Sequence, residues 1–367
     1  MTDLASQYQR IREEVDAAMQ AVLGRAAFIN GQEVSAFAEE LSAYMGVGHV
    51  IPCANGTDAL QIALMALDLA PGAEVITPGF SYAAVAEVCG LLGFKAVYAD
   101  VDPLTYNIQV GSIEALITPA TKVIIPVHLF GQCADMSNIM AIANKHGLYV
   151  IEDNAQSVGA ICQMPEGQKM SGTMGHLSTM SFFPSKNLGC YGDGGAVCTN
   201  DAQLAARVKM IANHGQSVKY YHDIIGVNSR LDTLQAAVLR VKLRHLDGFI
   251  EERRQVAAAY DEAFKDLSEF VIPGRASYST HVFHQYTMQL PNHSVKSVQE
   301  SLKGHGIPSM VYYPLPLYKQ KAYFAPVNLP VSEALCQRVL SLPMGTDMSK
   351  EQIDYITFTT KAIVKQK

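Results

Sequence analysis

Residues 49–69 read HVIPCANGTDALQIALMALDL, a short β-rich run that turns directly into a helical stretch. The same alternation repeats along the chain, in AEVITP (73–78), SYAAVAEVCGLLG (81–93), KAVYADV (95–101), KVIIPVHLF (122–130), MSNIMAIANKHG (136–147) and LYVIED (148–153). Strand, helix and strand at this spacing predict right-handed crossovers and a mostly parallel sheet with helices on both faces. We therefore expect an α/β protein whose ligand site lies beyond the carboxyl ends of the strands.

Composition sets the outer limits of the interpretation. The 367 residues are 49% hydrophobic and 17% charged, which supplies a large core and excludes disorder, collagen-like repetition and a small disulfide-stapled scaffold. Lys and Arg total 28 against 34 Asp and Glu, a formal charge of -6. Because phosphate backbones are bound by clustered cations, this balance argues against a nucleic-acid partner and leaves room only for a local cationic pocket.

Cysteine usage and the amino terminus both indicate the cytoplasm. Seven cysteines occur without a Cys-x-x-Cys pair, so we predict reduced, mostly buried thiols. Residues 1–20 read as a polar amphipathic helix without the apolar core of a signal peptide. No uncharged apolar run approaches the ~20 residues that span a bilayer, so we expect no membrane association.

A long helical segment divides the chain. Residues 231–264 keep helical periodicity throughout, long enough to bridge two domains, and we place the boundary inside this helix near residue 247. This predicts a large domain with the N-terminal helix (1–247) and a smaller α+β domain (248–367). The smaller domain is expected to contain a strand at 282–290, a helix at 294–306 and a Pro-rich turn at 312–317.

Gly56 and Thr57 stand where the first predicted strand turns into a helix. Backbone N–H groups of a first helical turn and a Thr hydroxyl form a site that fits a phosphate. An ordinary helix cap with a glycine turn explains the same residues.

Asp153 and Lys186 are the other two candidates at this edge of the sheet. Asp153 ends the strand LYVIED and could hold a cationic ring nitrogen, although it could equally cap the next segment; Glu152 should point to the other face. Lys186 opens the glycine-rich loop in SFFPSKNLGCYGDGG (181–195), whereas most lysines are solvated surface charges.

The combination is more informative than its parts. A helix terminus for a phosphate, a carboxylate for a pyridine nitrogen and an amine for a Schiff base are what pyridoxal 5′-phosphate requires. The three features should converge on one crevice, so the residues predict this cofactor.

The chain also resembles a known family over nearly its whole length. The similarity to the DegT-type sugar aminotransferases, a branch of fold-type I pyridoxal phosphate enzymes, is carried by CANGTDALQIAL (53–64), ITPGFSYAAVAE (76–87), VIEDNAQSVGA (150–160), SFFPSKNLGCYGDGGA (181–196) and GVNSRLDTLQAAVL (226–239). Within the family these stretches are most similar to enzymes that aminate a UDP-linked 2-acetamido-3-oxo-glucuronic acid for surface polysaccharides.

The resemblance implies a role for each matching residue. Lys186 would form the Schiff base, Asp153 would pair with the pyridine nitrogen, Gln156 would lie beside the phenolic oxygen and Tyr82 would stack on the ring. The phosphate would be bound by Gly56, Thr57 and Ser181.

Two more residues imply a shared site. Asn228 matches a residue that in the family reaches the phosphate from the neighbouring subunit, so the resemblance implies a homodimer. Arg230 would meet the substrate's negative charge. The amino donor would be an amino acid, with glutamate expected, and the acceptor a UDP-linked keto sugar.

One departure concerns the substrate. Where the family often has His-Tyr-Pro or His-Phe-Pro, this chain has Tyr312-Tyr313-Pro314. The change leaves the cofactor chemistry untouched and puts the identity of the sugar in doubt. Both tyrosines are candidate substrate contacts.

Other kinds of function fit the sequence less well. Related sugar dehydratases carry His in place of the Schiff-base lysine, so Lys186 argues against a dehydratase. A regulatory protein that binds the cofactor without turnover does not explain Lys186, Asp153 and Ser181 together. The sequence offers no metal-ligand spacing, Rossmann glycine pattern, phosphate-binding Gly-x-x-x-x-Gly-Lys loop or Gly-x-Ser-x-Gly elbow.

Overall fold

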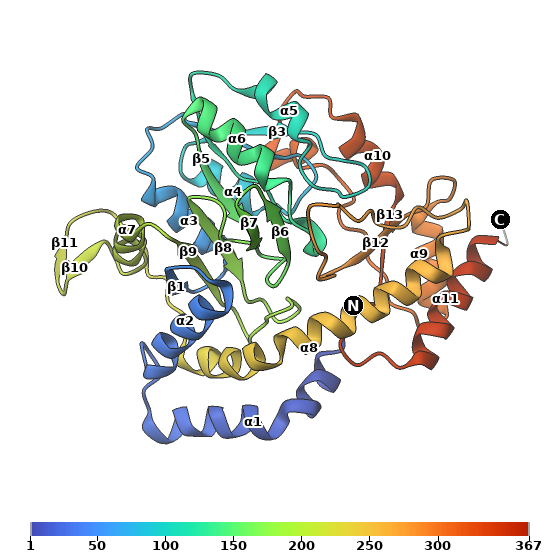
Figure 1. Ribbon diagram of the computed structural model, residues 1–367, viewed down its shortest axis with the longest axis horizontal. Helices are drawn as coiled ribbons and strands as arrows, with labels where there is room; N and C mark the ends of the chain where they lie inside the picture. Colours follow the sequence, from blue (N-terminus) through green and yellow to red (C-terminus); the bar gives the residue numbers. More distant parts are fainter. Residues whose placement is uncertain (1, 366–367) are drawn as a thin grey trace.

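The computed structural model describes residues 2–365. Its centre is a seven-stranded sheet in which only β9 runs antiparallel to its neighbours (Figure 1). In spatial order the strands are β1 (His49–Cys53), β9 (Gly195–Thr199), β8 (Leu177–Ser181), β5 (Tyr149–Asp153), β4 (Thr121–Ile124), β2 (Glu74–Pro78) and β3 (Lys95–Ala99).

Both faces of the sheet are covered by helices. One face packs on α3 (Gly56–Ala66), α4 (Ala84–Leu91) and α7 (Ala202–Ala212), and the other on α2 (Gln32–Met45), α6 (Met136–His146) and α8 (Thr233–Phe264). Strand residues alternate between these two cores, as Val75 and Val123 do against Ile76 and Ile124. This alternation is the side-chain geometry of a pleated strand buried on both sides. The predicted mostly parallel sheet between helices is confirmed.

The helix α8 links this sheet to the C-terminal part of the chain. Leu239 and Leu243 belong to the core under the sheet, whereas Val256 and Phe264 belong to the C-terminal core. The helix α1 (Leu4–Arg25) lies along α8 (Figure 1) and contacts it through an apolar cluster that includes Val15. The division near residue 247 stays a prediction.

The C-terminal part is built on a two-stranded antiparallel sheet with helices packed against it. Its elements are α9 (Val295–Gly304), α10 (Pro330–Arg338), α11 (Lys350–Lys365), β12 (Tyr286–Gln289), β13 (Val339–Leu342), η3 (Leu317–Lys319) and η4 (Lys321–Tyr323). The remaining elements are α5 (Val110–Ile113), η1 (Glu114–Leu116), η2 (Leu129–Gly131), and the hairpins β6 (Ile161–Met164) with β7 (Gly167–Met170) and β10 (Gln216–Val218) with β11 (Tyr221–His222).

Two predicted strands are shorter than their apolar runs. The run 122–130 forms a strand only to Ile124; Val127 makes one further bridge to Asp153, and Phe130 takes a positive φ of 59° inside η2. The run 282–290 pairs as a strand only from Tyr286, because Phe283 has a φ of 48°. Both exceptions lie beside the cavity described below, and both were invisible to apolar patterning.

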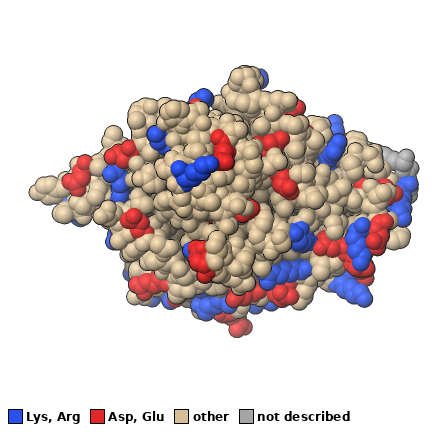
Figure 2. Space-filling view, turned by 45° about the horizontal axis from the view of Figure 1, so that its top comes forward, with Lys and Arg blue, Asp and Glu red and all other residues tan. Residues whose placement is uncertain are grey.

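Surface charge is mixed in sign. Figure 2 shows basic and acidic side chains interspersed on one face. Among residues 2–365, no helix combines the length and apolar character needed to cross a bilayer.

Candidate active site

A cavity of about 470 Å³ lies at the carboxyl ends of β1, β5 and β8. This is the edge where parallel sheets place ligands. The cavity is closed on another side by residues just before β12 and after α9. Of the residues predicted from the sequence, it brings together Gly56, Thr57, Tyr82, Asp153, Gln156, Ser181, Lys186, Tyr312 and Tyr313.

One end of the cavity is the start of α3. Asn55 caps the helix, its side chain accepting a hydrogen bond of 2.8 Å from the backbone N–H of Asp58. A Cβ on Gly56 would lie 2.7 Å from Cβ of Ser181, so only glycine lets the helix start approach β8 this closely. Free N–H groups of a first helical turn, together with hydroxyls of Thr57 and Ser181, can bind a phosphate here.

Asp153 ends β5 and borders the cavity. Its Oδ1 accepts a hydrogen bond of 3.1 Å from the backbone N–H of Ala155. Burial raises the pKa of Asp153, while this hydrogen bond and the nearby positive charge of Lys186 oppose the rise. A cationic ring nitrogen placed against the carboxylate would lower the pKa again.

Glu152, the preceding residue, points to the other side of the strand. Its oxygens accept hydrogen bonds from the N–H groups of Gly172, Met174 and Gly175 and contact Nε2 of His128 at 2.8 Å. It is fully buried and holds loop backbone in place. Glu152 is therefore structural, as strand alternation predicts.

Lys186 follows the turn after β8, where its own N–H donates to the carbonyl of Phe183 at 2.8 Å. The side chain is partly exposed through the mouth of the cavity, yet it is surrounded by protein atoms. This desolvation lowers the pKa of Lys186 to about 8, and Asp153 counteracts the shift. An amine that is largely neutral slightly above pH 8 can act as a nucleophile and as a base.

Three aromatic or amide side chains complete the wall. Oε1 of Gln156 accepts a hydrogen bond of 2.9 Å from the N–H of Phe130, and Gln156 also hydrogen-bonds Tyr313. Burial raises the pKa of Tyr313 above its usual range, so its hydroxyl stays protonated. Tyr82 lies at the mouth with 62% of its surface exposed, available to cover a flat ring.

Asn228 and Arg230 do not line this cavity. They flank Ser229, which is buried and hydrogen-bonds Asp58 at the start of α3. Asn228 is exposed and Arg230 is partly exposed. Ser229 is therefore fixed at the start of α3, whereas its two neighbours lie outside the lining of the cavity.

Several residues of the cavity were not predicted from the sequence. Phe130, His284 and Gln285 come from irregular segments, and Ser185 lies next to Lys186. Ser185 could have been found from its place in the lysine loop. His284 and Gln285 gave no signal, because the run around them reads as an ordinary strand.

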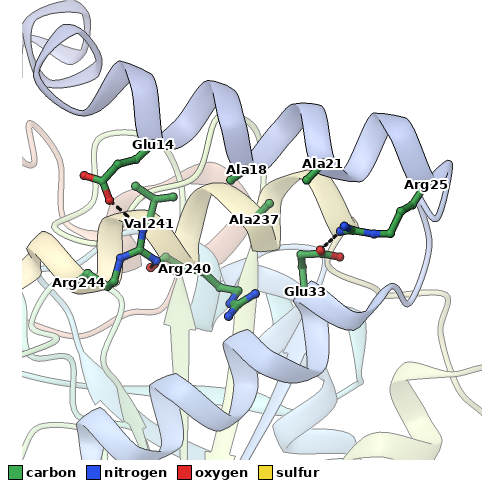
Figure 3. Close-up of a pocket in the computed structure, with 9 residues that line it drawn as sticks. All are labelled: Glu14, Ala18, Ala21, Arg25, Glu33, Ala237, Arg240, Val241 and Arg244. Atoms are coloured by element: carbon green, nitrogen blue, oxygen red, sulfur yellow. Dashed lines mark hydrogen bonds and ion pairs between the residues drawn. The ribbon is translucent and has the colours of Figure 1, made fainter.

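A second, smaller cavity of about 300 Å³ lies between α1 and α8 (Figure 3). Ala18, Ala21 and Ala237 leave the space because their side chains are too short to fill it. The charges around it are paired within the chain: Arg25 with Glu33, Arg244 with Glu14 at 2.8 Å, and Arg240 with Glu40 at 2.6 Å. It contains none of the residues predicted for the site.

Comparison with known proteins decides the family. The model of the DegT/DnrJ/EryC1/StrS aminotransferase family matches residues 9–360. The chain belongs to this family. A Pseudomonas aeruginosa protein named UDP-2-acetamido-2-deoxy-3-oxo-D-glucuronate aminotransferase is 49% identical over 96% of this chain and 97% of its own. An Acidithiobacillus ferrooxidans protein named UDP-N-acetyl-3-dehydro-alpha-D-glucosamine 3-aminotransferase is 45% identical over 96% and 94%.

The structure agrees with this membership. The crystal structure of NtdA from Bacillus subtilis, described with bound cofactor PMP, superposes with a TM-score of 0.89 at 31% identity, covering 96% of this chain and 82% of that one. The predictions of a DegT-type enzyme, of an aminotransferase and of pyridoxal 5′-phosphate as the cofactor are confirmed. The amine, carboxylate, hydroxyls and helix start of the cavity fit that cofactor.

Proposed function

We propose that this aminotransferase transfers the amino group of glutamate to the 3-oxo group of a UDP-linked 2-acetamido sugar, with the 3-oxo-glucuronate as the expected acceptor. The observation that carries the proposal is the meeting of Lys186, with a pKa of about 8, and Asp153 in one cavity beside the anion-binding start of α3. The choice of sugar is supported by the two relatives, both named for a UDP-linked 3-oxo sugar. The amino sugar would enter a surface polysaccharide, and the reaction would take place in the cytoplasm.

Each side chain of the cavity would have its own role in the reaction. Bound pyridoxal phosphate supplies a conjugated ring that withdraws electrons from the carbon whose proton is exchanged. The carboxylate of Asp153 holds the proton on the ring nitrogen. Nζ of Lys186 would hold the cofactor through a covalent link, and as a free amine it would take up and return the exchanged proton, as general base and then acid. Gly56, Thr57 and Ser181 bind the phosphate, while Gln156 and Tyr82 orient the ring.

The substrate side is formed by residues of the C-terminal part. Tyr312 and Tyr313 line the cavity, and Tyr312 hydrogen-bonds Gln285. We propose both tyrosines as substrate contacts. Tyr312 replaces an imidazole with a phenol at this wall, which alters the hydrogen bonding offered to the sugar.

We further propose a homodimer with shared sites, in which Asn228 reaches the partner's phosphate and Arg230 the partner's substrate. Support comes from the place of both residues outside the cavity of their own chain. The neighbouring hairpin β10–β11 and the segment after it also carry exposed apolar side chains, among them Tyr220 (78%), Tyr221 (70%) and Ile225 (86%). Such apolar surface is typical of an interface.

The substrate proposal is tested with the pyridoxamine form of the enzyme, prepared by exposure to glutamate. A panel of UDP- and dTDP-linked keto sugars is added, and the return of the absorbance of lysine-bound cofactor is followed. We expect the fastest return with UDP-2-acetamido-3-oxo-glucuronate. No response to any 3-oxo UDP sugar contradicts the choice of acceptor, and failure of glutamate to convert the cofactor contradicts the choice of donor.

The shared site is tested by mixing two inactive variants. Lys186→Ala and Asn228→Asp subunits, when exchanged into mixed dimers, rebuild one intact site if Asn228 acts on its partner, so activity returns. Mixing Lys186→Ala with Asp153→Asn is the control: both residues line one chain's cavity, so no activity is expected. Absence of recovery in the first mixture, with mixed dimers verified by mass, would show that Asn228 acts within its own chain.

A further inference from the structure

His284 is a buried imidazole in the wall of the cavity that the roles above do not use. It is 6% exposed and borders the same space as Lys186. Its Nδ1 has no hydrogen-bond partner within the part of the chain described, and its Nε2 meets only the side-chain nitrogen of Gln285, at a long 3.5 Å. Buried polar atoms normally have strong partners. The imidazole of His284 has only this weak contact within the protein and lies at the edge of a ligand cavity. We therefore expect a polar group of the bound ligand to hydrogen-bond it.

The protonation state of His284 limits what that partner is. Burial lowers the pKa of His284 well below its usual value, and the positive charges of Lys186 and Arg253 lower it further. The ring is therefore neutral at physiological pH, with one N–H. The amide nitrogen of Gln285 can only donate, so in that contact Nε2 accepts; with the Gln285 amide turned over, Nε2 can carry the hydrogen instead. Nε2 can therefore accept a hydrogen bond or donate one, whereas Nδ1 is buried without a partner within the part of the chain described.

The backbone around His284 is held in an unusual conformation. Phe283 has a φ of 48°, and its N–H donates to Nδ1 of His281 at 2.9 Å. The guanidinium of Arg253, itself 1% exposed, donates to the carbonyls of Phe283 (3.2 Å) and His284 (3.5 Å). Backbone in the left-handed region costs a non-glycine residue energy and is concentrated at functional sites.

The facing segment contributes to the same arrangement. The N–H of Val282 donates to the carbonyl of Gly131 at 2.8 Å. Gly131 has a φ of 109°, and a Cβ there would lie 2.8 Å from the backbone nitrogen of Phe283. The close approach therefore requires glycine. These contacts hold His284 against the cavity instead of letting residues 281–285 continue the strand β12.

We propose that His284 is a substrate-specificity residue whose Nε2 forms a hydrogen bond with an uncharged hydroxyl of the sugar, on the carbon next to the one that receives the amino group. In a 3-oxo sugar this is the 4-hydroxyl, since carbon 2 carries the acetamido group. A neutral imidazole suits a hydroxyl, whereas a carboxylate of the amino donor is matched by a cation. The inference rests on the proposed function and deepens it.

The test uses two substitutions and a binding measurement that needs no turnover. His284→Leu removes both nitrogens, and His284→Gln keeps an N–H donor near the position of Nε2. The product, UDP-2-acetamido-3-amino-glucuronate, is titrated into the pyridoxamine-form holoenzyme by calorimetry. We expect Leu to weaken binding about 10- to 100-fold and Gln to restore most of it. His176→Asn is the matched control, because His176 also uses Nδ1 to accept a backbone hydrogen bond (3.0 Å, from Val150) but lies at the opposite end of the sheet.

The two half reactions separate the outcomes. His284→Leu should slow the reaction with the 3-oxo sugar and leave conversion by glutamate and the cofactor spectrum unchanged. Removing the 4-hydroxyl from the sugar should slow the wild-type reaction by a similar factor and should not slow the Leu variant further. The measurement on wild-type protein remains valid even if the Leu variant misfolds. Three results would overturn the inference. The Leu variant could bind the product as tightly as wild type, the wild-type enzyme could use the 4-deoxy sugar as well as the full sugar, or His284→Leu could slow only the reaction with glutamate. A wild-type enzyme that responds to no 3-oxo UDP sugar would instead contradict the proposed function.

Discussion

Oγ of Ser229 donates a hydrogen bond of 2.6 Å to Oδ2 of Asp58 and accepts one of 3.0 Å from the backbone N–H of Ala54. The contact joins the segment before α8 to the turn between β1 and α3. Ser229 is buried by these contacts, whereas Asn228 before it is exposed and Arg230 after it is partly exposed. A short hydroxyl contact thus fixes the segment before α8 against the wall of the cavity.

Ser229→Ala should destabilise the fold by about 1–3 kcal/mol, because it leaves the N–H of Ala54 and the carboxylate of Asp58 without their partner. Urea denaturation followed by circular dichroism measures the change. Ser217→Ala is the control: Ser217 makes a similar 2.6 Å bond to Asp223, but in an exposed place, so we expect a change within about 0.5 kcal/mol. Equal effects of the two substitutions would contradict the role given to Ser229.

Gly56→Ala should weaken cofactor binding at least about 10-fold and destabilise the protein by about 1–3 kcal/mol, because the new Cβ forces the first turn of α3 away from Ser181. Spectroscopic titration of cofactor-free protein checks the affinity. The control is Gly248→Ala in the middle of α8, where nothing lies within 4 Å of the added Cβ. That change should stabilise the helix by about 0.5–1 kcal/mol and leave cofactor affinity as it is. Unchanged affinity in Gly56→Ala would refute the phosphate site at the start of α3.

Lys186→Ala should abolish turnover and the absorbance of lysine-bound cofactor, while the fold stays intact because the side chain lines the cavity and is partly exposed. In the wild-type protein, borohydride reduction followed by peptide mass spectrometry should place the cofactor on the peptide that contains Lys186. The exposed Lys209→Ala variant should behave like wild type. An active, coloured Lys186→Ala enzyme would disprove the assignment.

In cofactor-free protein, labelling of Lys186 by acetic anhydride should rise with pH around a midpoint near 8. The lowered pKa of Lys186 means that the amine loses its proton near pH 8, compared with about 10.4 for an ordinary lysine. The negative charge of Asp153 raises the pKa of Lys186, so Asp153→Asn should move the midpoint to lower pH. Free lysine in the same mixture is the internal reference. A wild-type midpoint near 10, or an upward move in Asp153→Asn, would contradict the electrostatic account of the site.

The fold was largely readable from local patterns. The alternation of β-rich and helical runs predicted the sheet and its helices, and the order of residues at strand ends predicted that Gly56, Asp153 and Lys186 would converge. These inferences succeeded because the period of apolar residues reflects burial, and because parallel strands place their carboxyl ends on one edge.

The irregular segments in the wall of the cavity could not be predicted from local sequence patterns. The segment 282–290 has the composition of a strand, and Phe283 leaves that conformation only because Arg253 and the loop at Gly131 hold it. These partners lie about 30 and 150 residues away in the chain (from 283 to 253 and to 131). Local propensity cannot report contacts of that separation.

The sequence by itself determined the chemistry that this protein can carry: an amine, a carboxylate and a helix start, at intervals that a parallel sheet brings to one edge. Only the tertiary structure decided how that chemistry is surrounded. Burial lowers the pKa of Lys186, His284 lies in the wall of the cavity, and Asn228 and Arg230 lie outside it. The physical reason is that residue type and local periodicity are properties of short segments, whereas desolvation and side-chain direction depend on neighbours that are distant in the chain.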